Sequence, residues 1–174
     1  LDKAKKMDTS EDEYYSIIEK KTASLIASCC AIGAVSAGAD TEQTETLRQF
    51  GINAGIAFQI RDDIFDYQPN NKSGKGYGND IREHKMTLPL IHLLRESSLT
   101  ERTVIKTKIV LSGKKKKTID EIISLANEKH SIEYATEKMN MYIGKAESQL
   151  NKLGDNEACN DLRNLMCYCI KREK

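Results

Sequence analysis

The sequence predicts an all-α protein, and three observations support this prediction. Its 174 residues include only 2 Pro and 10 Gly, so long stretches are free of helix breakers. Within these stretches, apolar residues recur with the 3.6-residue period of a helix that is buried on one side. The chain is 39% hydrophobic with a formal net charge of +1, a composition that folds rather than remaining disordered. We therefore expect one domain, a bundle-like array of helices with one long loop.

Local signals place the individual helices. The first begins near Ser10, where Ser10-Glu11-Asp12-Glu13 resembles a capping box, and Gly38 can end it after about residue 37. The second runs from Thr41 to about residue 67. Pro89 occupies the first turn of a third helix, which starts at Thr87 and ends near residue 96. Further helices are expected near residues 100–111, 118–129, 132–153 and 157–172.

The balance of charges excludes some classes of partner. With 27 basic and 26 acidic residues, the chain has no overall charge that would attract nucleic acid or an anionic membrane. The basic run at residues 114–117 contains no interleaved aromatic residue, so we interpret it as a solvated joint between helices. No nucleic-acid partner is expected.

Residues 22–39 carry no charge, and their length approaches that of a membrane span. Many of them are Ser, Gly, Ala and Cys, which contribute little to membrane insertion. We expect instead a helix packed on all sides by other helices, and no transmembrane segment. The five cysteines lack zinc-ligand spacing, so we expect reduced, mostly buried thiols in a cytoplasmic protein.

Three aspartates close the second predicted helix. Asp62 and Asp66 are one helical turn apart on one face, and Asp63 is about 100° from Asp62. Like charges at this spacing destabilise a helix, and carboxylates are also unfavourable at a helix C-terminus. Mg²⁺ would resolve the conflict, because carboxylate oxygens are its preferred protein ligands. An ordinary solvated helix end is the alternative.

The loop at residues 68–79 follows directly and favours the metal interpretation. It contains Lys72, Lys75 and the glycines of Gly74-Lys75-Gly76-Tyr77-Gly78. Flexible glycines allow lysines and backbone N–H groups to close over a phosphate. The loop lacks the spacing of a nucleotide-binding P-loop. Carboxylates, Mg²⁺ and lysines together predict a diphosphate site.

These residues resemble the trans-type polyprenyl diphosphate synthases. Residues 58–66 match that family's second aspartate-rich motif, Phe-Gln-x-x-Asp-Asp-x-x-Asp. The motif is followed, in the family's order, by Gly74-Lys75, Asn79-Asp80-Ile81 and the Lys-x-Thr-x-Pro segment at residues 85–89. Upstream, Lys21-Thr22 looks like the family's Lys-Thr pair. In style the chain is most similar to octaprenyl and other long-chain members.

The resemblance implies a role for each matching residue. Asp62, Asp63 and Asp66 would form a Mg²⁺-binding face, with Asp62 and Asp66 as the principal contacts. Lys21, Lys75 and Lys85 would neutralise the departing allylic diphosphate. Thr22 and Gln59 would direct oxygens toward the developing allylic cation, and Phe58 would border the isopentenyl diphosphate pocket. The implied reaction condenses isopentenyl diphosphate with an allylic prenyl diphosphate to give a medium or long trans-polyprenyl diphosphate.

The sequence departs from the family in one respect, because it has no second Asp-Asp-x-x-Asp. The resemblance therefore implies that residues 1–174 form the C-terminal half of an isoprenoid (terpenoid) synthase fold, without the first aspartate-rich half. We expect the chain to be inactive alone and the intact enzyme to be a homodimer. A non-catalytic subunit of a heteromeric prenyl synthase and a terpene cyclase-type diphosphate lyase are the alternatives.

Overall fold

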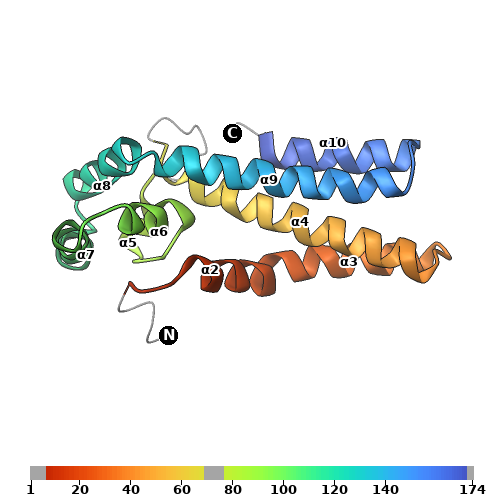
Figure 1. The fold of residues 1–174 in the computed structure, drawn as a ribbon, viewed down its shortest axis with the longest axis horizontal. Helices are drawn as coiled ribbons and strands as arrows, with labels where there is room; N and C mark the ends of the chain where they lie inside the picture. Colours follow the sequence, from red (N-terminus) through yellow and green to blue (C-terminus); the bar gives the residue numbers. More distant parts are fainter. Residues whose placement is uncertain (1–6, 69–76, 172–174) are drawn as a thin grey trace. The chain divides into compact units, whose positions relative to one another are not determined.

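The computed structural model describes residues 7–68 and 77–171, and these residues form helices joined by turns (Figure 1). No strand occurs in these two ranges, which confirms the all-α prediction. The helices, in chain order, are α2 (Glu11–Ile18), η1 (Glu19–Ala23), α3 (Ser24–Ser36), α4 (Thr41–Phe65), α5 (Asn79–Arg82), α6 (Leu88–Arg95), α7 (Leu99–Ser112), α8 (Lys116–Glu128), α9 (Ser131–Lys152) and α10 (Glu157–Lys171).

The first predicted helix contains an interruption that its sequence does not signal. Its start is confirmed as a capping box, since Ser10 N–H donates to Glu13 at 3.0 Å and Glu13 N–H donates to the Ser10 hydroxyl at 3.2 Å. Between α2 and α3, however, the segment Glu19–Ala23 forms a π-helical turn. Gly38, with φ of +79°, ends the helix as expected. Turns of the π type are found often at functional sites, and this one contains Lys21 and Thr22.

The chain divides into two compact units. The first unit comprises residues up to Tyr14 and Asp62–Glu137. Its core lies among α6, α7 and α8, with Tyr67 and Ile81 packed beside them. The fully buried Leu90, Leu93, Ile109, Ile119 and Ile122 are central to this core. Pro89 lies in the first turn of α6, as predicted.

The second unit comprises Tyr15–Arg61 and the residues from Lys138 onward. Within it, α4 lies against η1 and α3 at two glycines. A Cβ built at Gly51 would lie 2.6 Å from Ala27 Cα, and one at Gly55 would lie 2.6 Å from Ala23 Cα. The guanidinium of Arg61 donates to the carbonyl of Ile170 at 2.9 Å, which links α4 to the last turns of α10. Small residues thus set how closely these helices approach.

Two expectations about the charge-free segment and the cysteines were wrong. Helix α3 is not covered on all sides, because Leu25, Ile32 and Val35 are 62–69% exposed. Apolar residues are not gathered on one face of this helix, so the sequence does not predict which of them are exposed. All five cysteines are free, as predicted, but only Cys159 is buried and Cys29 is exposed.

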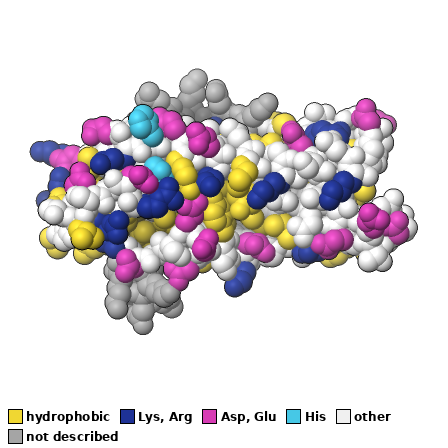
Figure 2. Space-filling model, viewed as in Figure 1, with side chains coloured by type: hydrophobic (Ala, Val, Ile, Leu, Met, Phe, Trp, Pro, Cys, Tyr) yellow, Lys and Arg dark blue, Asp and Glu magenta, His cyan; other side chains and the backbone are white. Residues whose placement is uncertain are grey.

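The surface agrees with the near-neutral composition. On the face shown in Figure 2, basic and acidic side chains are interspersed rather than gathered into fields of one sign. All four lysines of residues 114–117 are exposed, in agreement with the solvated joint that we expected there. None of the helices within residues 7–68 and 77–171 combines the length and the apolarity that spanning a bilayer requires.

Candidate functional site

The three aspartates at the end of α4 have different surroundings. The helix continues to Phe65, so Asp62 and Asp63 lie in its last turn and Asp66 in the turn that follows. Asp62 is exposed, Asp66 is half-buried, and Asp63 is buried at 5% exposure. Asp62 and Asp66, which we expected to be the principal metal contacts, thus remain at least partly exposed to solvent, whereas Asp63 does not.

The buried carboxylate of Asp63 accepts hydrogen bonds from two other segments of its unit. The Tyr14 hydroxyl, in the first turn of α2, donates to Asp63 Oδ2 at 2.8 Å. The N–H of Leu88 donates to the same oxygen at 3.2 Å. Leu88 is the first residue of α6, where backbone N–H groups lack helical partners and favour a negative charge. Asp63 therefore binds the end of α4 to the start of α6.

Asp66 organises the segment that follows the loop. Its two carboxylate oxygens accept the N–H groups of Asn79 and Asp80, each at 2.8 Å. The N–H of Gly78 donates to the Asp66 carbonyl, also at 2.8 Å. Gly78 has φ of +72°, and a Cβ there would meet the Ile119 side chain, so the turn requires glycine. Sequence reasoning placed Asp66 and Asn79-Asp80 in separate motifs, but the structure joins them.

Burial raises the pKa of the Asp66 carboxyl above its ordinary value of 3.8, and the negative charge of Asp80 acts in the same direction. The two backbone hydrogen bonds act against this shift. A carboxylate with a raised pKa gains more than an ordinary one from a nearby cation. Such a cation can be a metal ion or a basic side chain.

One basic side chain of the predicted site lies beside this turn. Lys85 Nζ is 3.0 Å from Asp80 Oδ1 and 2.7 Å from Glu83 Oε2, and its side chain is 54% exposed. Its hydrogen bonds to Glu83 and Asp80 raise the pKa of the Lys85 ammonium above its ordinary value. Lys85 therefore remains charged and accessible, connected through Asp80 to the segment that Asp66 holds.

In the second unit, the structure brings together two further predicted residues. The Thr22 hydroxyl donates to Gln59 Oε1 at 3.1 Å. The close approach of Gly55 to Ala23, one turn of α4 before Gln59, permits this contact. Lys21 is exposed beside Thr22 in the π turn, and Phe58 is half-buried beside Gln59. The remaining predicted lysine, Lys75, lies outside the described residues.

Within residues 7–68 and 77–171, no group of three or more His, Cys, Asp or Glu side chains is arranged around a common point. Mg²⁺, however, is usually held by one or two carboxylates and retains several waters or phosphate oxygens. The exposed Asp62 and the half-buried Asp66, whose two oxygens also accept backbone N–H groups, are one turn apart and are the two carboxylates that could serve in this way.

Comparison with known proteins places these features in context. The family model described as "Polyprenyl synthetase" matches residues 1–126. Octaprenyl diphosphate synthase of Haemophilus influenzae is 32% identical over 166 residues, which are 95% of this chain and 50% of that protein. The chain thus spans about half the length of the curated relatives it matches.

Solved structures give the same result. The geranylgeranyl pyrophosphate synthase of Bacteroides thetaiotaomicron superposes with a TM-score of 0.87 at 34% identity, over 99% of this chain and 57% of that one. A polyprenyl synthase of Caulobacter crescentus, complexed with calcium and isoprenyl diphosphate, has a TM-score of 0.86 at 30% identity, over 97% and 52% of the two chains. These relatives differ in product length.

Proposed function

Because the chain belongs to the polyprenyl synthetase family, we propose that it supplies the C-terminal half of an enzyme that condenses isopentenyl diphosphate with an allylic prenyl diphosphate. The observation that carries the proposal is the turn held by Asp66, whose carboxylate accepts the N–H of Asp80 at 2.8 Å, while the Asp80 side chain lies 3.0 Å from the charged Lys85. Such a turn suits a diphosphate that arrives with divalent metal. A medium or long trans-polyprenyl diphosphate is the proposed product.

In this proposal, Asp62 and Asp66 would hold Mg²⁺, which would supply positive charge to stabilise the departing diphosphate. Asp63 contributes to the metal-binding face by fixing the end of α4 against Leu88. The calcium in the Caulobacter crescentus structure supports a divalent ion in that protein.

The remaining residues act on the organic part of the reaction. Lys21, Lys75 and Lys85 neutralise the diphosphate while the allylic C–O bond breaks and leaves a carbocation. The oxygens of Thr22 and Gln59 direct partial negative charge toward that cation, and Phe58 borders the isopentenyl pocket. The isopentenyl double bond then attacks the cation, and loss of a proton to the medium or the departing diphosphate restores neutrality.

We propose that the chain alone is inactive and that the intact enzyme is a homodimer. Two observations support the first part: the chain spans about half of its relatives, and it has one Asp-Asp-x-x-Asp instead of two. An assay of the 174-residue chain with Mg²⁺, farnesyl diphosphate and radiolabelled isopentenyl diphosphate tests this part directly. Extractable polyprenyl product above the blank would contradict it. Light scattering of the intact enzyme tests the dimer.

The metal assignment is tested in the intact enzyme with the variant Asp62→Asn. We expect turnover to fall by several orders of magnitude while the circular dichroism spectrum is unchanged. The matched control is Asp161→Asn, an exposed aspartate of α10. Turnover of Asp62→Asn within about tenfold of the unmodified enzyme, a change of only about 1.4 kcal/mol in barrier, would contradict the assignment.

The same assay separates the alternatives. Elongated diphosphates indicate a synthase, whereas cyclised hydrocarbons indicate a terpene cyclase. Elongation that appears only after a second, catalytic polypeptide is added indicates a non-catalytic subunit. The whole Lys-x-Thr-x-Pro segment and the preceding loop favour the synthase.

A further inference from the structure

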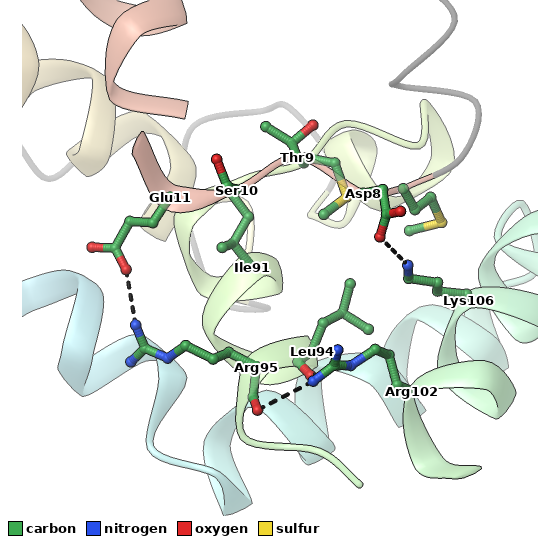
Figure 3. A pocket seen from close by; sticks show the side chains of 11 residues that line it. Asp8, Thr9, Ser10, Glu11, Ile91, Leu94, Arg95, Arg102 and Lys106 are labelled. Carbon is green, nitrogen blue, oxygen red and sulfur yellow. Dashed lines mark hydrogen bonds and ion pairs between the residues drawn. The ribbon is translucent and has the colours of Figure 1, made fainter. Parts of the chain in front are cut away.

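A cavity in the first unit is separate from every residue assigned to the proposed reaction. Figure 3 shows it between the segment of residues 7–11, helix α6 and helix α7. Its volume is about 300 Å³, at the lower end of the range for small-molecule sites. Met7, Ile91 and Leu94 provide apolar lining, and Arg95, Arg102 and Lys106 provide positive charge.

Two of these cations come from one face of α7. Arg102 and Lys106 are four residues apart, a spacing at which like charges lie one above the other and destabilise a helix. Both line the same cavity. A chain gains from this arrangement when an anion binds between the two groups.

The three cations of the cavity differ in their partners. Arg95 is paired with Glu11 at 2.9 Å and with Glu96 at 3.1 Å, and Lys106 is paired with Asp8 at 2.9 Å. Arg102 donates instead to the backbone carbonyls of Leu94 at 2.9 Å and Arg95 at 3.5 Å. Within the described ranges, no carboxylate forms an ion pair with Arg102. Arg102 therefore keeps a positive charge that no ion pair within these ranges offsets.

Another anion can easily replace Asp8 as the partner of Lys106. The side chain of Asp8 is 73% exposed, whereas that of Lys106 is only 24% exposed. Exposed ion pairs contribute roughly 0–1 kcal/mol, so a second anion can replace Asp8 at little cost. Met7 is 2% exposed and packs in the core of the unit, which keeps the adjoining wall in place when Asp8 moves.

The geometry points to a binding site for a small amphipathic anion. Its phosphate or carboxylate head would be held by Arg102 and Lys106, and a short apolar body would lie over Ile91 and Leu94. A free inorganic anion would use the cations but not the apolar lining. An uncharged alcohol would use only the lining.

Hexyl phosphate tests this site by isothermal titration of the full chain in EDTA, which keeps divalent metal from the proposed diphosphate site. We expect saturable binding at one site per chain. Inorganic phosphate and 1-hexanol should each bind at least about tenfold more weakly, because phosphate lacks the apolar body and 1-hexanol lacks the charged head. Hexanoate shows whether the head must be a phosphate or can be a carboxylate, and both results support an anion site.

The variant Lys106→Gln should weaken hexyl phosphate binding about tenfold, the loss expected from one charge-assisted hydrogen bond. Lys108→Gln is the matched control, since Lys108 lies on the same helix, pairs with Glu121 at 2.9 Å and does not line the cavity. Arg102→Gln is a weaker test, because Arg102 also binds the end of α6.

Three results would overturn the inference. The first is the absence of saturable binding. The second is an equal loss of affinity in Lys106→Gln and Lys108→Gln, which would indicate non-specific attraction. The third is a loss in Lys85→Gln as large as that in Lys106→Gln, which would place the ligand at the proposed diphosphate site. Failure of the proposed synthase activity would leave this binding unchanged.

Discussion

The hydroxyl of Tyr14 donates a 2.8 Å hydrogen bond to Oδ2 of Asp63, and the two residues are 49 positions apart in sequence. Both side chains are buried, at 4% and 5% exposure. A buried carboxylate is costly unless donors compensate for the water it has lost. This bond therefore helps to fix the aspartate-rich turn in position from within the buried part of the unit.

Replacing Tyr14 by Phe removes one donor to the buried Asp63 and keeps the ring. We expect the free energy of unfolding to fall by about 1–2 kcal/mol, measured by urea denaturation followed by circular dichroism. Tyr168→Phe, at a tyrosine that is 67% exposed, should leave the midpoint unchanged. Identical midpoints for the two variants would show that the bond contributes nothing to stability.

Asp66 predicts a pH dependence. Because its pKa is raised in the folded chain, folding favours the protonated carboxyl. Its stabilising contribution is therefore fully present below the unfolded pKa of about 3.8 and is lost as pH rises through the folded pKa. In metal-free urea titrations across this window, the unmodified chain should lose stability relative to Asp66→Asn. A difference in stability between the two proteins that is independent of pH would contradict the shift.

Gly55→Ala should destabilise the second unit, because the added Cβ would lie 2.6 Å from Ala23 Cα and neither backbone can yield cheaply. Overpacking of this kind costs about 1–3 kcal/mol. Gly144→Ala is the matched control, since nothing lies within 4 Å of a Cβ there, and within helix α9 it should stabilise by about 0.5–1 kcal/mol. Thermal unfolding measures both, and shifts of the same sign would contradict the close approach.

Thr22→Val tests the contact with Gln59 and depends on the proposed function. The variant keeps the shape of the side chain but removes the hydroxyl that donates at 3.1 Å. We expect kcat of the intact enzyme to fall about tenfold, with little change in KM, because the oxygen acts on the developing cation. Thr103→Val, whose hydroxyl bonds the Leu99 carbonyl on α7, serves as the control. A rise in KM at unchanged kcat would assign Thr22 to substrate binding instead.

Features determined by a few neighbouring residues could be predicted from the sequence. The Ser10–Glu13 capping box, the end of a helix at Gly38 and the position of Pro89 in α6 all follow from local chemistry. The pairing of Thr22 with Gln59 was anticipated only as a shared role. That they touch depends on the glycine contact between two helices.

Features determined by tertiary packing could not be predicted. The three aspartates look equivalent in the sequence, yet Asp63 is buried because Tyr14 and Leu88 supply donors from distant segments. The joining of Asp66 to Asn79-Asp80 likewise depends on how the chain returns after the loop. The small side chains of Ala23 and Ala27 are buried against α4, whereas the larger Leu25 is exposed. Hydrophobicity alone would predict the opposite, with Leu25 buried in preference to the alanines.

The π turn at Glu19–Ala23 makes the number of residues before α3 as important as their identity. Such a turn accommodates one residue more than the α-helical path it replaces, and one residue corresponds to about 100° of rotation around the helix axis. Deleting one residue between Ile18 and Ser24 would therefore return the segment to the α-helical path, whereas winding all of its residues as a regular α-helix would turn α2 by about 100° relative to α3. Chimeras with other members of the family should be joined outside this turn, or should match its length.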